Sequence, residues 1–95
     1  MKTKDERTAA LQKRLEKANK VPKAPSFADV YNNRGHAYYD QRNLDMAISD
    51  FNEAIRLNPG FADAYNNHGY AQHLTGNSAE ANADFTTARR LKAAQ

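Results

Sequence analysis

The sequence predicts an all-α protein built from two stacked helix-turn-helix hairpins, with one further helix at the N-terminus. The first observation behind this prediction is an internal repeat, because PSFADVYNNRG begins at Pro25 and PGFADAYNNHG begins at Pro59. Eight of the eleven letters agree, and the two starts lie 34 residues apart. A fixed period of roughly 20–50 residues is typical of repeat architectures. The second observation is that apolar residues within each copy follow the spacing of one helix face.

The repeat continues to the end of the sequence. Aligning residues 28–61 with residues 62–95 gives 14 identities in 34 positions, which is more than coincidence explains. The residues of the first copy that recur are Ala28, Asp29, Tyr31, Asn32, Asn33, Gly35, Ala37, Asn43, Ala47, Asp50, Phe51, Ala54, Arg56 and Leu57. We therefore divide this part of the chain into repeat one, residues 26–61, and repeat two, residues 62–95.

The first helix of each repeat is predicted near residues 27–41 and 61–75. Tyr31, Gly35 and Tyr38 are spaced by four and three, which places them on one face of a helix. Turn-like segments follow, QRN in the first copy and TGN in the second. Each unit is therefore expected to turn back on itself.

The second helix of each repeat is predicted near residues 44–57 and 78–91. In the first copy, four apolar residues spaced by four, three and three form the expected buried face. They are Ala47, Phe51, Ala54 and Leu57. This spacing marks one side of a helix, so each unit is a helical hairpin.

Helix start signals agree with these boundaries. Ser26 and Asp29 have nearly the pattern of a capping box, and Asn77 and Glu80 have its spacing. In a capping box, two side chains three residues apart each bond the backbone N–H of the other. We therefore expect such boxes at the start of the first helix in repeat one and of the second helix in repeat two.

Residues 1–25 differ from the rest of the chain in charge. They hold eight Lys or Arg and three Asp or Glu, a net +5, whereas residues 26–95 hold six and eight, a net −2. Thr3 with Glu6 fits a capping box, so a basic helix is predicted from there to about Asn19. The sequence PKAP then forms a linker, because closely spaced prolines end a helix.

This N-terminal helix carries a narrow apolar stripe, and two interpretations of it stay open. The stripe repeats the rhythm of the second helices in Leu11, Leu15, Ala18 and Val21. In the first interpretation, the helix docks on the first helix of repeat one, as the second helix of a degenerate preceding repeat. In the other it is a frayed, solvated helix, because isolated helices are marginal. If this helix docks, we expect the chain to be a monomer. If it does not dock, we expect a weak homodimer.

Repeat two is expected to end the array. Four apolar positions of the second helix become polar in repeat two, while the internal face is kept. There Leu44, Met46, Ile48 and Ile55 are replaced by Ser78, Glu80, Asn82 and Arg89. A terminal repeat needs such a polar outer face for solubility.

These residues make the chain resemble the tetratricopeptide repeat family, whose 34-residue unit uses an aromatic or large residue, Gly, Tyr, Ala, an aromatic, Ala and a closing Pro. Repeat one has this set as Tyr31, Gly35, Tyr38, Ala47, Phe51, Ala54 and Pro59. Repeat two has Tyr65, Gly69, Ala81, Phe85 and Ala88, with Gln72 and Ala93 in place of the Tyr and the Pro. The family's usual Leu before the Gly is Arg34 in one repeat and His68 in the other. The resemblance implies a module that binds other proteins.

The first helices are expected to line a concave binding surface. The candidate residues, on the face opposite the second helix, are Asp29, Asn32, Asn33, His36, Tyr39, Asp40, Asp63, Asn66, Asn67, Tyr70, His73 and Leu74. Asn33 and Asn67 are the best candidates, because an amide offers an acceptor and donors to an extended peptide backbone. The resemblance gives this role to the second Asn of each pair. Asn32 and Asn66 are expected to bond neighbouring backbone or water instead.

The predicted partner is a neutral or basic peptide segment of another protein. A subset of the resembled family grips the C-terminal carboxylate of heat-shock chaperones with Lys, Asn and Arg. The positions of its basic residues are occupied here by Asn32, His36, Asn66 and Tyr70. Asp29, Asp40 and Asp63 on the same face make the groove neutral to acidic. Charge complementarity therefore argues against a carboxylate-clamp chaperone partner.

Composition and motifs bear on catalysis and on metal binding. The sequence has no cysteine, which excludes thiol catalysis and zinc–thiolate sites. It has no phosphate loop, nucleophile elbow or zinc motif, so we expect neither an enzyme nor a cofactor. His36, His68 and His73 are poorly spaced for a metal site, and none is expected.

Two alternatives to peptide binding remain open. The basic N-terminal segment could attract nucleic acid, although it lacks aromatic residues that stack on bases and contains Asp5, Glu6 and Glu16. Two chains could instead complete one another's short arrays as a self-associating scaffold. No signal peptide or membrane span is evident, so a cytoplasmic location is the default expectation.

Overall fold

The computed structural model describes residues 26–95, which form four helices and contain no strand. The helices are α2 (Phe27–Asp40), α3 (Leu44–Leu57), α4 (Ala62–Leu74) and α5 (Ser78–Ala93). Each boundary lies within two residues of its predicted position. The predicted N-terminal helix and its linker lie outside the described residues.

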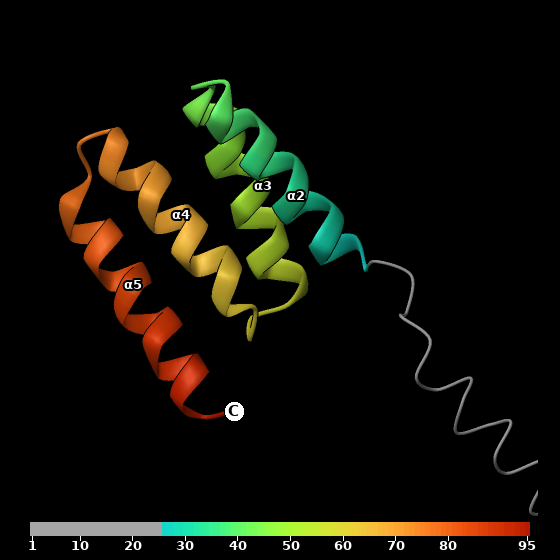
Figure 1. The fold of residues 1–95 in the computed structure, drawn as a ribbon, viewed down its shortest axis with the longest axis vertical. Helices are drawn as coiled ribbons and strands as arrows, with labels where there is room; N and C mark the ends of the chain where they lie inside the picture. Colours follow the sequence, from blue (N-terminus) through green and yellow to red (C-terminus); the bar gives the residue numbers. More distant parts are fainter. Residues whose placement is uncertain (1–25) are drawn as a thin grey trace, which may run out of the picture.

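The four helices form two antiparallel hairpins that stack side by side. The α2 helix packs along α3, and α4 packs along α5. The hairpins meet mainly through α3 and α4, with a smaller contact between α2 and α4 (Figure 1). The prediction of stacked helical hairpins is therefore confirmed. Within the described part, no helix has the length and apolar character that crossing a membrane requires.

One of the two predicted capping boxes is present. The Asp29 backbone N–H donates to Ser26 Oγ over 3.2 Å, and the Ser26 N–H donates to Asp29 Oδ2 over 3.1 Å. The box predicted at Asn77 is wrong, because its side chain makes no cap bond. The Asn77 amide instead donates to Gln72 Oε1 over 2.7 Å and to Thr75 Oγ1 over 3.2 Å. The two bonds donated by Nδ2 orient the amide toward the preceding turn, so its Oδ1, the atom that a cap would use, accepts no bond from the start of α5.

The turns inside the two hairpins have the same construction. The Asn43 N–H donates to the Tyr38 carbonyl, and the Asn77 N–H donates to the Gln72 carbonyl, both over 2.9 Å. The preceding residue is left-handed in each turn, with φ 61° at Arg42 and 89° at Gly76. Glycine adopts this conformation without strain, whereas a side chain there costs about 1–2 kcal/mol. The second turn is therefore better matched to its conformation.

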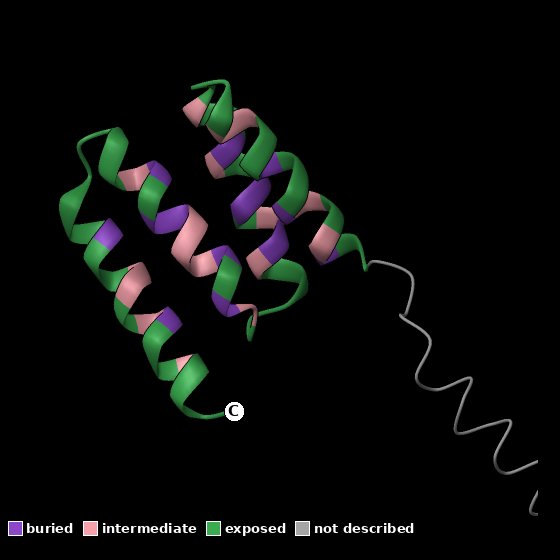
Figure 2. Cartoon of the chain, viewed as in Figure 1, coloured by how far each residue is buried: buried purple, intermediate pink, exposed green. Residues whose placement is uncertain are grey.

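The buried residues lie where the helices face one another (Figure 2). They are largely alanine around one aromatic ring. Phe51 is fully enclosed and packs with Ala47 and with Ala71 of the next repeat. Its ring lies so close to Gly35 that a Cβ added there would be 2.7 Å from Phe51 Cε1. Phe85, the equivalent ring in repeat two, is only partly buried. The repeated Gly–Phe pair thus allows the helices of each hairpin to approach closely.

The ends of the array differ from its centre. The four polar replacements on α5, at Ser78, Glu80, Asn82 and Arg89, are all exposed. Leu57, which was predicted to be internal, is 39 % exposed. It ends α3 beside Phe27, which is 78 % exposed. The prediction that Leu57 is buried is therefore wrong, because the start of α2 beside it is exposed to solvent.

Candidate functional site

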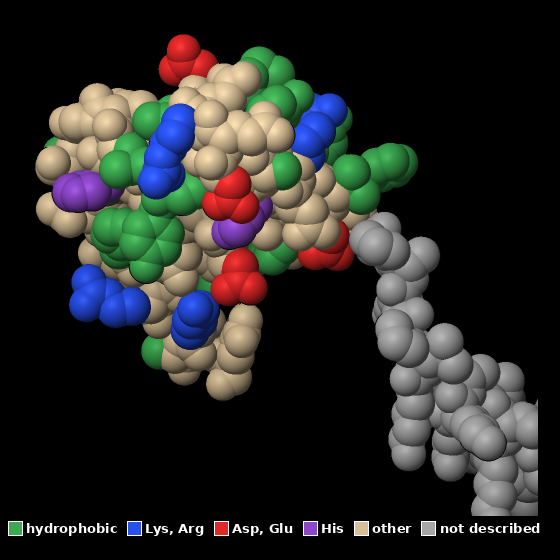
Figure 3. Space-filling model, turned by 45° about the horizontal axis from the view of Figure 1, so that its top comes forward, with side chains coloured by type: hydrophobic (Ala, Val, Ile, Leu, Met, Phe, Trp, Pro, Cys, Tyr) green, Lys and Arg blue, Asp and Glu red, His purple; other side chains and the backbone are tan. Residues whose placement is uncertain are grey.

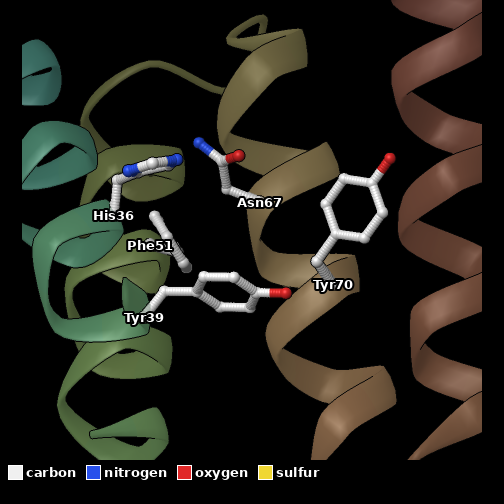
Figure 4. Close-up of a pocket in the computed structure, with 5 residues that line it drawn as sticks. All are labelled: His36, Tyr39, Phe51, Asn67 and Tyr70. Carbon is white, nitrogen blue, oxygen red and sulfur yellow. The ribbon is translucent and has the colours of Figure 1, made fainter. Parts of the chain in front are cut away.

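A cavity of about 270 Å³ opens between the two first helices, α2 and α4. His36 and Tyr39 of α2 and Asn67 and Tyr70 of α4 form its walls, and Phe51 of α3 completes the lining. In Figure 4 the Tyr39 ring extends from α2 toward α4, and the Asn67 amide points back toward His36. The cavity therefore needs both repeats, because neither hairpin alone supplies its two walls.

Four of the predicted groove residues meet in this cavity, and their sequence spacing explains why. His36 and Tyr39 are three residues apart on α2, and Asn67 and Tyr70 have the same spacing on α4. Residues three apart on a helix lie on one face, so each helix presents a pair. Phe51 was predicted only as a core residue. Its part in the lining depends on how α3 lies behind the two first helices, which sequence spacing alone does not reveal.

The paired asparagines have unequal environments. Asn67 Nδ2 donates to Asn32 Oδ1 over 3.0 Å, which joins α4 to α2 across the repeat boundary. Asn32 is 9 % exposed, so its predicted bond to backbone or water is replaced by this amide–amide bond. Asn67 retains its own carbonyl oxygen and one N–H for a ligand. Asn33 is exposed but does not line the cavity, and Asn66 is partly buried.

The predicted acidic residues are held by different neighbours. Asp40 Oδ2 lies 3.4 Å from His36 Nδ1, and Asp63 Oδ1 lies 3.7 Å from Lys92 Nζ of α5. Asp29 belongs to the capping box of α2. On the face shown in Figure 3, carboxylates and a histidine lie near a hydrophobic patch. Asp40, beside a cavity residue, is therefore the carboxylate best placed to act on a ligand.

Aromatic contacts hold the cavity walls in place. The Tyr70 ring meets the Phe85 ring edge to face, with centroids 5.1 Å apart. The Arg42 guanidinium lies 5.4 Å from the centroid of the Tyr39 ring, which in turn is 6.4 Å from the His36 ring. The two remaining predicted residues, His73 and Leu74, are exposed at the end of α4 outside the cavity. The walls are therefore supported by neighbouring side chains before any ligand arrives.

Sequence reasoning missed two polar pairs that tie each first helix to its second helix. Arg34 donates two hydrogen bonds of 2.7 Å to the buried carboxylate of Asp50. In repeat two, His68 Nδ1 lies 2.5 Å from Asp84 Oδ2. These bonds to Asp50 and the negative charge of its carboxylate raise the pKa of Arg34 above its usual value, so Arg34 stays charged. The sequence does contain a signal for these pairs, because Arg34 and His68 each lie 16 residues before an Asp.

The described residues offer little for metal or redox chemistry. Within residues 26–95, no three His, Asp or Glu side chains come close enough to hold a metal ion. His36 and His68 each face a single carboxylate. The Nε2 of His68 is buried and has no hydrogen-bond partner in this part of the chain. The cavity is lined by one amide, one imidazole and three aromatic rings.

Comparison with known proteins agrees with the repeat analysis. Family models described as tetratricopeptide repeat match residues 28–61 and residues 51–81. The first match coincides with the repeat unit, and the second spans the boundary between the hairpins. A search among curated proteins found no match. The chain therefore belongs to the tetratricopeptide repeat family, whose repeats generally mediate protein–protein interactions and are typically non-catalytic.

Proposed function

We propose that this protein binds a neutral or basic peptide segment of a partner protein in the cavity between α2 and α4, without catalysis. The observation that carries this proposal is the cavity itself, whose walls come from both repeats and include Asn67. The remaining acceptor and donor of the Asn67 amide suit the C=O and N–H of an extended peptide. Family membership supports the same class of partner.

The size and lining of the cavity favour one anchoring side chain. At about 270 Å³ it is smaller than the sites that enclose whole drug-sized ligands, roughly 300–1,000 Å³. Tyr39 and Tyr70 provide apolar contact area for an aliphatic, aromatic or long cationic side chain, and the enclosed Phe51 ring lies behind them. The peptide backbone would then run along the first helices, where Asn67 fixes its direction.

Charge selects among such peptides. The described residues carry a net charge of −2, and no Lys or Arg lines the cavity. Asp40 lies on the cavity side of α2 beside His36. An acidic peptide would be repelled by Asp40, and the nearest cation, Arg42, lies against the Tyr39 ring and outside the cavity lining, whereas a basic peptide gains attraction. Tyrosine rings add to this preference, because a cation is attracted to a ring face.

Binding can be tested with immobilised ten-residue peptides that differ in net charge. Neutral and basic peptides should bind with micromolar affinity, as is typical of small transient interfaces, and acidic ones should bind least. Tyr70→Ala should weaken binding about tenfold or more, as removal of a central aromatic anchor does. Because Tyr70 is 54 % exposed, the melting temperature should change little. Preferential binding of acidic peptides would contradict the proposal.

The asparagines supply a matched pair for the same assay. Asn67→Ala should weaken binding several-fold and also lower stability by about 1–3 kcal/mol, because Asn32 loses its partner while buried. Asn33→Ala makes the same chemical change outside the cavity and should have the smaller effect on binding. The double substitution should lose binding while the circular dichroism spectrum stays helical. Equal effects of the two single substitutions would contradict the assigned geometry.

Salt dependence separates this proposal from nucleic-acid binding by residues 1–25. Binding of a neutral peptide through amide bonds and aromatic contacts should change little between low and moderate salt. Oligonucleotide binding should weaken steeply, with a log–log slope near about −0.9 per phosphate neutralised. An oligonucleotide that binds more tightly than every peptide, and loses its affinity on removal of residues 1–24, would favour the alternative.

A further inference from the structure

The 34-residue repeat allows α2 and α4 to be compared position by position. On α4, Ala64 and Ala71 are fully enclosed and His68 is buried. The equivalent residues of α2 are Val30, Arg34 and Ala37. Val30 is 50 % exposed, the Arg34 side chain is 54 % exposed, and Ala37 is exposed. The same helix face is therefore covered in repeat two and open in repeat one.

The open face continues to the start of α2 and the end of α3. Phe61 is partly buried, whereas its equivalent, Phe27, is 78 % exposed. Two shallow hollows flank Phe27 and Leu57, one toward Tyr31 and the other toward Asn58. We use the name α2 outer face for Phe27, Val30, Arg34, Ala37 and Leu57.

A helix covers the equivalent face in repeat two. Ala71 of α4 packs against Ala47 and Phe51 of α3, with Ile48 beside them. Because the two first helices share their sequence pattern, the α2 outer face is shaped to receive a helix placed as α3 is placed on α4. An apolar helix face left open in water is unfavourable by roughly 25 cal/mol for each Å² of apolar surface.

We propose that the N-terminal segment of this chain, residues 3–21, docks as a helix on the α2 outer face. The segment joins directly to the start of α2, so no long connection has to be ordered. Leu11, Leu15 and Ala18 lie 33 residues before Leu44, Ile48 and Phe51. This separation differs from the 34-residue repeat period by one residue. Two of the three matched α3 residues, Ile48 and Phe51, pack with Ala71 of α4, so the apolar stripe of the segment falls at α3 positions that contact the first helix.

Length and linker fit this placement. A helix over residues 3–21 would be about 28 Å long, against about 21 Å for the 14 residues of α2. In the register that matches Ala18 to Phe51, Val21 corresponds to Ala54. Five residues separate Val21 from Phe27, and six separate Ala54 from Phe61. The linker therefore has nearly the length of the chain that connects the equivalent positions of α3 and α4.

The charges of the segment favour it over a second copy of the chain. At helical spacing, Lys13 and Lys20 lie on the side opposite the apolar stripe and Lys17 lies at its flank, whereas Arg7 and Arg14 lie within the stripe. Docking would direct Lys13 and Lys20 to water and contribute to the polar surface that a terminal repeat requires. Association of two copies through the α2 outer face would instead bring two such segments, each with net charge +5 for residues 1–25, near one another.

Engineered cysteines test the contact directly in the full chain, which has no cysteine of its own. Ala18→Cys with Ala37→Cys should form an intrachain disulfide under oxidised glutathione at low protein concentration. Lys20→Cys with Ala37→Cys is the matched control, because position 20 faces away from the stripe. The first pair should crosslink several times faster than the control. Equal rates, or crosslinks between molecules in place of intrachain ones, would overturn the docking.

A second measurement does not depend on disulfide geometry. Leu11→Ser with Leu15→Ser should lower the melting temperature by more than about 4 °C, because the docked stripe is lost. Ala9→Ser with Lys13→Ser introduces the same residues on the opposite side and should change it by less. Sedimentation should show a monomer in the parent chain. An unchanged melting temperature in the stripe variant, or a parent chain that is a dimer through α2, would refute the proposal.

Discussion

Phe51→Ala should lower the free energy of unfolding by about 3–5 kcal/mol, the range found for truncated core aromatics. Phe51 is fully enclosed and contacts both its own hairpin and Ala71 of the next one. Its removal therefore leaves a cavity at the junction of three helices. Urea unfolding followed by circular dichroism measures the loss, and a variant already unfolded in water would fit a loss of this size.

Phe85 provides the matched control for this substitution. It occupies the same position in repeat two and faces Gly69 as Phe51 faces Gly35. Because Phe85 is only partly buried, Phe85→Ala should cost clearly less than Phe51→Ala. A loss below about 1 kcal/mol for Phe51→Ala would mean that its ring is not in the core.

Gly35→Ala should destabilise the protein by about 1–3 kcal/mol, although alanine is the better helix former by roughly 1 kcal/mol. The new Cβ would lie 2.7 and 2.8 Å from two carbons of the Phe51 ring and 3.2 Å from Asp50 Cβ. The Phe51 ring has no exposed surface and packs with Ala47 and Ala71, so moving it away from Gly35 would disturb the junction of the hairpins. Thermal unfolding measures the change.

Substitutions at two further glycines serve as controls for this prediction. Gly69→Ala brings the new Cβ within 2.7 Å of Phe85, but that ring is partly exposed and has room to shift, so the loss should be smaller. Gly60→Ala places its Cβ no closer than 3.6 Å to another atom and should be nearly neutral. A stabilised Gly35→Ala variant would show that helix propensity outweighs the contact with Phe51.

The fold could be predicted because its information is local and repeated. A 34-residue period and apolar spacing of three and four residues indicate hairpins without reference to any distant contact. The exposed residues on α5 followed from the replacement of apolar by polar side chains in the second copy. The capping box at Asn77 failed because capping spacing alone does not reveal how the amide is oriented, and here Nδ2 donates to two acceptors in the adjacent turn.

The candidate site was only partly accessible from the sequence. Helix geometry placed His36, Tyr39, Asn67 and Tyr70 on exposed faces of the first helices, and the structure brings these four together. The bond between Asn32 and Asn67 was not predicted, because it depends on how closely two hairpins approach and at what angle. Contacts between repeats require that geometry, which periodicity does not contain.

The asparagine pair also works as a two-sided connector. The first Asn of one repeat accepts a bond from the second Asn of the repeat that follows, as Asn32 does from Asn67. A unit that must join neighbours on both sides therefore needs both asparagines, and both copies carry the pair. In a one-dimensional array of n units, such bonds would act in series as n−1 nearest-neighbour couplings. This chain has two units and therefore one such bond. Asn33 of repeat one and Asn66 of repeat two are the members of the two pairs that take no part in it.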